Sequence, residues 1–173
     1  MTESRVELGG RTWAIRETGD PSGRPLVYFH GTPSCRLEAA FADATCAELG
    51  VRLISFDRPG YGASTAQPFG LVSLANATAA VADRLGIGRF TTLGQSGGGP
   101  FSLACATVLG DRVVRAGVTA GAVPFQLVPG GYGHRYFETE TVPAWAGIMG
   151  LDPDADYSRI EAAIREANQG ATG

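Results

Sequence analysis

Apolar residues gather in short runs between residues 5 and 118, with polar turns or helix-like segments between the runs. Apolar and polar positions alternate over residues 5–16 on both sides of Gly9 and Gly10, and a two-glycine turn of this kind predicts a β-hairpin. Residues 25–30 are apolar on both faces, as in a buried parallel strand. Further strands are predicted at residues 51–56, 90–93 and 113–118.

Helices are predicted between these strands, because apolar side chains recur there at helical spacing. The first helix covers residues 36–49 and ends at Gly50, the second ends at Gly86, and the third continues to about Leu109. This alternation predicts an α/β fold in which a mostly parallel sheet has helices on both faces. The apolar positions are Leu37, Ala40, Phe41, Ala44 and Leu49 in the first helix and Leu74, Ala77, Val81 and Leu85 in the second.

Composition adds limits to this picture. The 173 residues suffice for one core, and their net charge of −3 argues against nucleic acid or an anionic membrane surface as the main partner. No apolar run is long enough to span a bilayer, and the N-terminus lacks the core of a signal peptide. The cysteines Cys35, Cys46 and Cys105 are odd in number and lack metal-type spacing. We therefore predict free thiols, a cytoplasmic protein, and neither metal nor cofactor.

The most informative stretch is the turn between the strand at residues 90–93 and the helix that follows. It reads Gly-Gln-Ser-Gly-Gly over residues 94–98, so that Ser96 lies at the tip of a sharp strand-turn-helix connection. Gly94 and Gly98 leave no side chain to collide where the strand and the helix cross. This geometry suits a reactive nucleophile held in a strained conformation. The alternative is a tight structural turn whose serine faces solvent.

Three polar groups are predicted to meet at one edge of the sheet. His30 and Gly31, Asp57, and Ser96 each follow a predicted parallel strand. Ligands bind beyond the carboxyl ends of the strands in open sheets of this kind. The sequence therefore predicts a single site at this edge.

These motifs together resemble those of the α/β-hydrolase family. The turn at Ser96 is similar to the family's nucleophile elbow, and the segment from His30 to Pro33 looks like its oxyanion-hole loop. Residues 57–64 (Asp-Arg-Pro-Gly-Tyr-Gly-Ala-Ser) resemble the family's loop after the fourth strand. The resemblance implies an N-terminal part of the hydrolase core over residues 1–124, cut off after the sixth strand, and a partial cap over residues 125–173.

The activity that this resemblance implies is hydrolysis of a small ester or related acyl substrate by a serine hydrolase. Ser96 Oγ would attack the carbonyl carbon, and the N–H groups of Gly97 and of the Gly31–Thr32 segment would bind the oxyanion. Thr32 is preferred as the second donor because Pro33 has no N–H. His30, Asp57, Gly94, Gln95 and Gly98 are implied as supporting residues of these motifs. A serine at position 96 counts against the dehalogenase and epoxide-hydrolase branches, whose nucleophile is a carboxylate.

The sequence departs from the family at the catalytic acid and base, which follow the nucleophile in the order acid, then histidine. Of the two histidines, His30 precedes Ser96 and is interpreted as a loop-positioning residue rather than a base. His134 follows Ser96, with Glu138 or Glu140 as its acid, but it falls in the predicted cap. The chain is therefore expected to end before its own acid and base, unless His134 replaces the missing histidine.

Other residues leave alternatives open. Asp57 is either a functional carboxylate or, as we favour, a cap for the turn after its strand. Cys35 is either a reactive thiol or a packed one. Trp145, Ile148 and Met149 line an acyl pocket or pack within the cap.

The rival function is a degenerate, non-catalytic hydrolase-like protein that binds a ligand or a partner. The strand at residues 113–118 forms a sheet edge that is expected to permit self-association.

Overall fold

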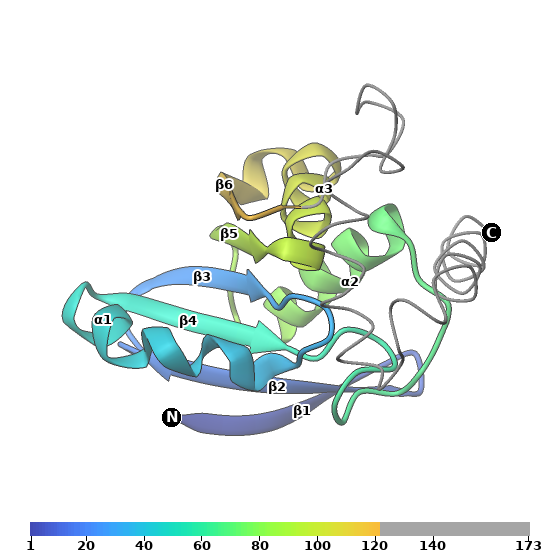
Figure 1. The fold of residues 1–173 in the computed structure, drawn as a ribbon, viewed down its shortest axis with the longest axis horizontal. Coiled ribbons are helices and arrows are strands. Elements are labelled where there is room, and N and C mark those ends of the chain that lie inside the picture. Colours follow the sequence, from blue (N-terminus) through green and yellow to red (C-terminus); the bar gives the residue numbers. More distant parts are fainter. Residues whose placement is uncertain (122–173) are drawn as a thin grey trace, which may run out of the picture. The chain divides into compact units, whose positions relative to one another are not determined.

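The structure is a computed structural model, and it describes residues 1–121. Six strands form one sheet in the order β1-β2-β4-β3-β5-β6 (Figure 1). β2 is antiparallel to β1 and β4, whereas the β4–β3, β3–β5 and β5–β6 pairs are parallel. The predicted mostly parallel α/β sheet is therefore confirmed. The strands are β1 (Thr2–Leu8), β2 (Arg11–Gly19), β3 (Arg24–Phe29), β4 (Val51–Phe56), β5 (Phe90–Gln95) and β6 (Val113–Thr119).

Helices lie on both faces of this sheet, as the sequence predicts (Figure 1). On one face, α2 and α3 pack over a core that includes Phe29, Phe56 and Cys105. On the other face, a smaller cluster of Tyr28, Leu53 and residues from η1 and α1 covers the same strands. Successive strand residues point to opposite faces, so Tyr28 and Phe29 enter different clusters. The helical elements are η1 (Arg36–Ala42), α1 (Asp43–Glu48), α2 (Leu71–Arg84), η2 (Ser96–Gly98), α3 (Gly99–Leu109) and η3 (Gly110–Arg112), of which the η elements are 3₁₀-helices.

The predicted N-terminal hairpin is also confirmed. β1 and β2 pair in register from Thr2 with Glu17 to Leu8 with Arg11, so that only Gly9 and Gly10 form the turn. Their φ angles of 57° and 75° lie in the left-handed region, which a type I′ turn requires at both central positions.

The prediction for residues 36–49 is wrong in two respects. The segment begins as the 3₁₀-helix η1 and changes to the short α1 at Asp43, instead of forming one α-helix. The apolar positions that predicted its buried face are largely exposed: Leu37, Phe41 and Leu49 are 51%, 73% and 62% accessible. The buried residues are Ala39 and Cys46 instead, because small side chains let this segment lie close against the sheet.

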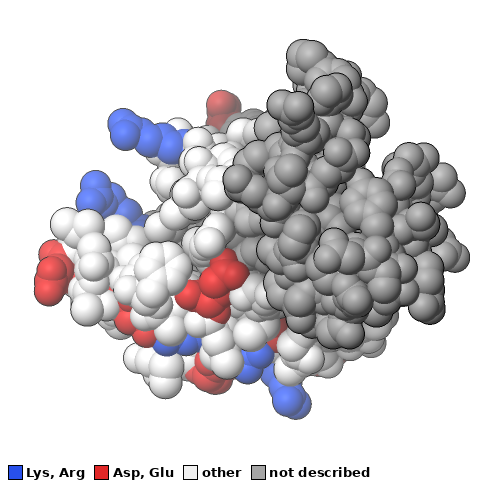
Figure 2. Space-filling model, in the orientation of Figure 1, with Lys and Arg blue, Asp and Glu red and all other residues white. Residues whose placement is uncertain are grey.

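The three cysteines are free thiols, of which Cys46 and Cys105 are buried and Cys35 is partly exposed. Within residues 1–121, no helix combines the length and apolar character needed to cross a membrane. In the same part of the chain, no three His, Cys, Asp or Glu residues are grouped closely enough to hold a metal ion. Charges of both signs are interspersed over the described part of the face in Figure 2. The predicted cap at residues 125–173 lies outside the described residues.

Candidate active site

The structure places the elbow as the sequence predicts, between β5 and α3. Gln95 is extended, Ser96 has a φ of 47°, and α3 follows the single 3₁₀ turn of η2. A non-glycine residue in the left-handed region costs on the order of 1–3 kcal/mol and persists only where its surroundings enforce it. Such strain is typical of the nucleophile of an α/β-hydrolase elbow. The predicted strained conformation at Ser96 is therefore present.

Close packing of backbone against backbone enforces this turn. A Cβ atom on Gly94 would lie 2.7 Å from the Gly99 Cα atom and closer still to the Gly98 carbonyl. A Cβ atom on Gly98 would meet the carbonyl oxygens of Phe29 and His30, the latter at 2.8 Å. Neither position tolerates a side chain, because a backbone atom cannot move aside as the end of a flexible side chain can.

The loop after β3 lies directly beside the elbow. An ideal Cβ on Gly31 would be 3.6 Å from the Ser96 Cβ, and one on Gly97 would be 3.6 Å from the Thr32 nitrogen. The Thr32 N–H has no hydrogen-bond acceptor in residues 1–121, and the Gly97 N–H lies in the first turn of η2, where backbone N–H groups have no partner within the helix. The structure therefore brings Ser96, Thr32 and Gly97 close together.

Gly31 differs from Thr32 in that its own polar groups are already occupied. The Gly31 N–H donates to both carboxylate oxygens of Glu38, at 2.9 and 3.2 Å. The Gly31 carbonyl accepts from Arg58 Nη2 at 2.9 Å and faces His30 Nδ1 at 2.8 Å. Within residues 1–121, the Gly31 N–H is therefore bound to Glu38, whereas the Thr32 N–H has no acceptor.

His30 is fully buried at the end of β3, and both of its ring nitrogens are engaged. Nδ1 donates to the Gly31 carbonyl, and Nε2 accepts the Arg58 backbone N–H at 3.3 Å, which fits a neutral ring with the proton on Nδ1. Burial and the nearby Arg58 charge lower the pKa of His30. These contacts agree with a histidine that positions the loop.

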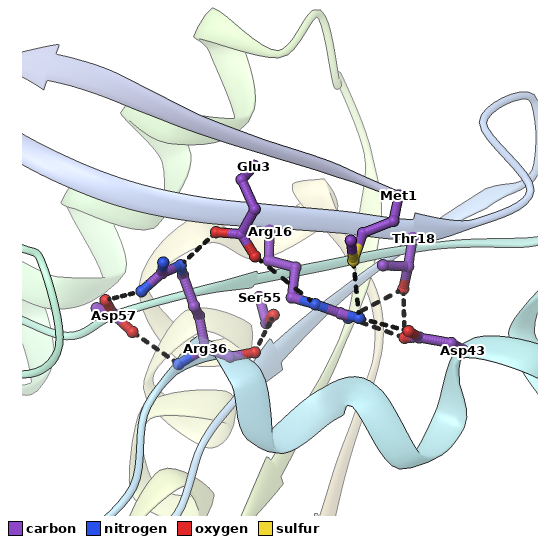
Figure 3. A network of polar contacts seen from close by, with 8 residues as sticks. All are labelled: Met1, Glu3, Arg16, Thr18, Arg36, Asp43, Ser55 and Asp57. Carbon is purple, nitrogen blue, oxygen red and sulfur yellow. Dashed lines mark hydrogen bonds and ion pairs between the residues drawn. The ribbon is translucent and has the colours of Figure 1, made fainter.

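Asp57 anchors the loop after β4 (Figure 3). Its fully buried carboxylate accepts the Arg36 N–H, Arg36 Nη1 and the Ala63 N–H at 2.7, 2.7 and 2.8 Å. Arg36 also pairs with Glu3 on β1 at 2.7 Å, which ties the loop to the edge of the sheet. The contacts match the turn-capping interpretation of Asp57.

Gln95 belongs to a polar group with Tyr28 and Glu38. Tyr28 Oη lies 2.6 Å from Gln95 Oε1 and 2.7 Å from Glu38 Oε1. Burial raises the pKa of Tyr28, and the hydrogen bond to Glu38 adds to that effect. Burial opposes ionisation of Glu38, but hydrogen bonds from Ser34, Tyr28 and Gly31 outweigh it and lower the pKa of Glu38. Glu38 is thus an ionised group that holds the Gly31 N–H.

Sequence reasoning missed three residues that shape this site, namely Arg36, Glu38 and Arg58. Arg58 follows Asp57 directly, so its place at a strand end was a usable signal. Arg36 and Asp57 are separated by 21 residues, and no local pattern indicates their contact. The residues proposed as substitute acid and base, His134, Glu138 and Glu140, lie outside the described residues, as do Trp145, Ile148 and Met149.

Comparison with known proteins identifies the family of this chain. Residues 24–144 match the family model described as alpha/beta hydrolase fold, and the chain belongs to that family. Membership supports a hydrolase. A comparison with curated proteins finds no match.

Solved structures share the fold at low sequence identity. The thioesterase domain from the curacin biosynthetic pathway is 20% identical, with a TM-score of 0.65 over 72% of this chain and 47% of that one. A predicted CIB-like hydrolase from Thermoplasma acidophilum is 21% identical, with a TM-score of 0.64 over 73% and 65%. The epoxide hydrolase VrEH1 from Vigna radiata is 19% identical, with a TM-score of 0.63 over 72% and 41%. The chain thus spans less than two thirds of each of these proteins.

Proposed function

We propose that this chain is a serine hydrolase that acts on a small ester or related acyl substrate, with Ser96 as its nucleophile. The observation that supports this most directly is the strained Ser96 beside the Thr32 and Gly97 N–H groups. A turn with a merely structural serine has no need of two neighbouring backbone N–H groups for which the described residues offer no acceptor. A serine rather than a carboxylate at this position also separates the chain from the epoxide-hydrolase chemistry of one fold neighbour.

The proposed reaction is acyl transfer through a covalent intermediate. Ser96 Oγ bonds to the substrate carbonyl carbon, and the carbonyl oxygen becomes an oxyanion that accepts hydrogen bonds from Thr32 and Gly97. The Ser96 proton passes through a general base to the leaving group as its bond breaks. Water then hydrolyses the acyl-serine and restores Ser96.

His30 does not fit the role of this general base, because both of its nitrogens are engaged and its pKa is lowered. The chain has two histidines, so His134 is the histidine left for the role within this sequence. Within residues 1–121 we therefore assign no general base and no acid, and His134 with Glu138 or Glu140 stays the alternative that the sequence offers.

The nucleophile can be tested by treating the protein with a fluorophosphonate and mapping the adduct by mass spectrometry. We expect the adduct on Ser96 and its loss in Ser96→Ala. Ser64→Ala is the matched control, because Ser64 lies in the neighbouring loop and its Oγ accepts the Ala14 N–H at 3.0 Å. Labelling of Ser64 or of many serines, or none at Ser96, would contradict the proposal.

A non-catalytic protein that associates through the edge of its sheet is the second candidate. Within residues 1–121, β6 pairs with β5 alone, and its Val114 and Val118 are 52% and 42% exposed. Unpaired apolar strand edges favour pairing with another chain. Val114→Lys should then reduce oligomers in light scattering after size exclusion, whereas Val72→Lys on the exposed face of α2 should not. A monomeric wild-type protein would exclude this candidate.

A further inference from the structure

Arg58 is a buried cation beside the proposed oxyanion hole. Its residue exposure is 3%, and it forms no ion pair with any carboxylate in residues 1–121. The guanidinium carbon lies 4.7 Å from the centre of the Tyr61 ring and 5.2 Å from that of Phe101. Burying a charge is costly, so a cation held in this way needs hydrogen bonds to compensate.

Those hydrogen bonds go to the two segments that hold the proposed oxyanion donors. Arg58 Nη2 donates to the Gly31 carbonyl at 2.9 Å and to Thr32 Oγ1 at 2.8 Å, both in the loop after β3. Arg58 Nη1 donates to the Gly97 carbonyl at 3.1 Å, in the elbow. One planar guanidinium therefore bridges both halves of the hole.

This bridge fixes the direction of the Thr32 N–H. The Gly31–Thr32 peptide bond is trans, so its carbonyl and its N–H point in opposite directions. Arg58 and His30 both bind that carbonyl, and the Thr32 N–H is consequently aimed away from them. The Gly97 N–H is held less directly, because Arg58 binds the Gly97 carbonyl, which belongs to the next peptide group.

We propose that Arg58 is the positioning residue of the oxyanion hole, an inference that rests on the proposed nucleophilic role of Ser96. The guanidinium of Arg58 sets the distance between the Thr32 and Gly97 N–H groups. Its positive charge favours the oxyanion over the neutral carbonyl of the substrate. Lysine cannot replace it, because an ammonium is a point donor that cannot bridge two carbonyls in one plane.

The test is the rate at which a fluorophosphonate labels Ser96, measured against probe concentration. In Arg58→Met, we expect the maximal rate to fall roughly 100-fold, the scale of effect of a misplaced catalytic group, while the probe concentration for half-maximal rate stays the same. Arg58→Lys should recover only part of the rate, because it restores charge but not geometry. Thr32→Val, which keeps the backbone N–H and removes one acceptor, should be slowed less than Arg58→Met.

Arg52→Met is the matched control. Arg52 is at the start of β4, whereas the site is at the other end, and its guanidinium pairs with Glu17 at 2.8 Å. We expect it to label at the wild-type rate.

The outcomes separate this inference from the proposed function. Wild-type labelling at Ser96 with an unchanged maximal rate in both Arg58 variants would overturn the positioning role and leave the nucleophile standing. A wild-type protein unlabelled at Ser96 would overturn both. If circular dichroism shows that Arg58→Met does not fold, Arg58→Lys and Thr32→Val decide by the same criterion.

Discussion

The turn after β5 and the turn after β4 border the same site, yet they are built in different ways. The elbow at Ser96 is held by the absence of side chains, because Gly94 and Gly98 let two backbone segments touch. The loop after β4 is held by side chains, because Asp57 and Arg58 bind groups from other segments. The glycines of the elbow lie together in one short motif, although Gly98 packs against the distant end of β3, whereas the loop after β4 depends on a charged side chain elsewhere in the chain, Arg36.

The largest effect on stability should come from the charged loop. Asp57→Ala removes a fully buried carboxylate and leaves the Arg36 guanidinium and two backbone N–H groups without it. Breaking a buried pair in this way costs about 3–5 kcal/mol, which urea unfolding would measure.

The matched control for Asp57 is Asp83→Ala. Its Arg112–Asp83 pair has the same 2.7 Å separation as Arg36–Asp57, but Asp83 is 65% exposed, so the cost should stay below about 1 kcal/mol. Equal losses in the two variants would show that burial does not distinguish these pairs.

A smaller loss is expected at the elbow. Gly98→Ala places a Cβ against the Phe29 and His30 carbonyls, and overpacking of this kind costs roughly 1–3 kcal/mol. Gly88→Ala makes the same chemical change where no atom lies within 4 Å, and it should alter the free energy of unfolding by less than about 0.5 kcal/mol. A Gly98→Ala protein as stable as wild type would mean that the crossing is looser than described.

The smallest effect concerns His30, which borders both turns. Its pKa is lowered in the folded state by burial and by Arg58. The pKa of His30 in the unfolded chain is about 6.5. As the pH falls below this value, the unfolded chain binds a proton at His30 before the folded protein does. The free energy of unfolding therefore decreases until the pH reaches the lower pKa of the folded state. His30→Asn should therefore flatten the decline in unfolding free energy below about pH 6.5. His134→Asn removes the other histidine and should keep the decline; an unchanged slope in His30→Asn would contradict the neutral, buried ring.

Much of the fold could be read from the sequence, because each strand and turn has a local signal. Gly9 and Gly10 predict the hairpin, and the glycines around Ser96 predict the elbow. The segment at residues 36–49 was misread because the apolar stripe of Leu37, Phe41 and Leu49 faces solvent, while small Ala39 and Cys46 face the sheet. Spacing alone does not indicate which side of a helix is close enough to the sheet to require small residues.

The candidate site was predicted in part, for a related reason. Ser96 and the backbone N–H groups of Thr32 and Gly97 lie within short motifs at strand ends, which the sequence displays directly. Arg58, the side chain that we propose to orient those donors, acts through contacts with residues 26 to 39 positions away in the chain. The sequence does not show whether an arginine is buried, and the burial of Arg58 against Tyr61 and Phe101 depends on the fold.

The unequal burial of the three thiols has a practical consequence. Burial raises the pKa of Cys105 to about 11 and also raises that of Cys46, which keeps both thiols protonated and inaccessible at neutral pH. Since the thiolate is the nucleophilic form, an alkylating fluorophore should attach to Cys35. Cys35 lies between Thr32 and η1, in the loop that Arg58 and Glu38 hold. The fluorescence of a dye attached to Cys35 would report a change in the conformation of this loop. Ligand binding at the proposed oxyanion hole could then be followed without measuring turnover.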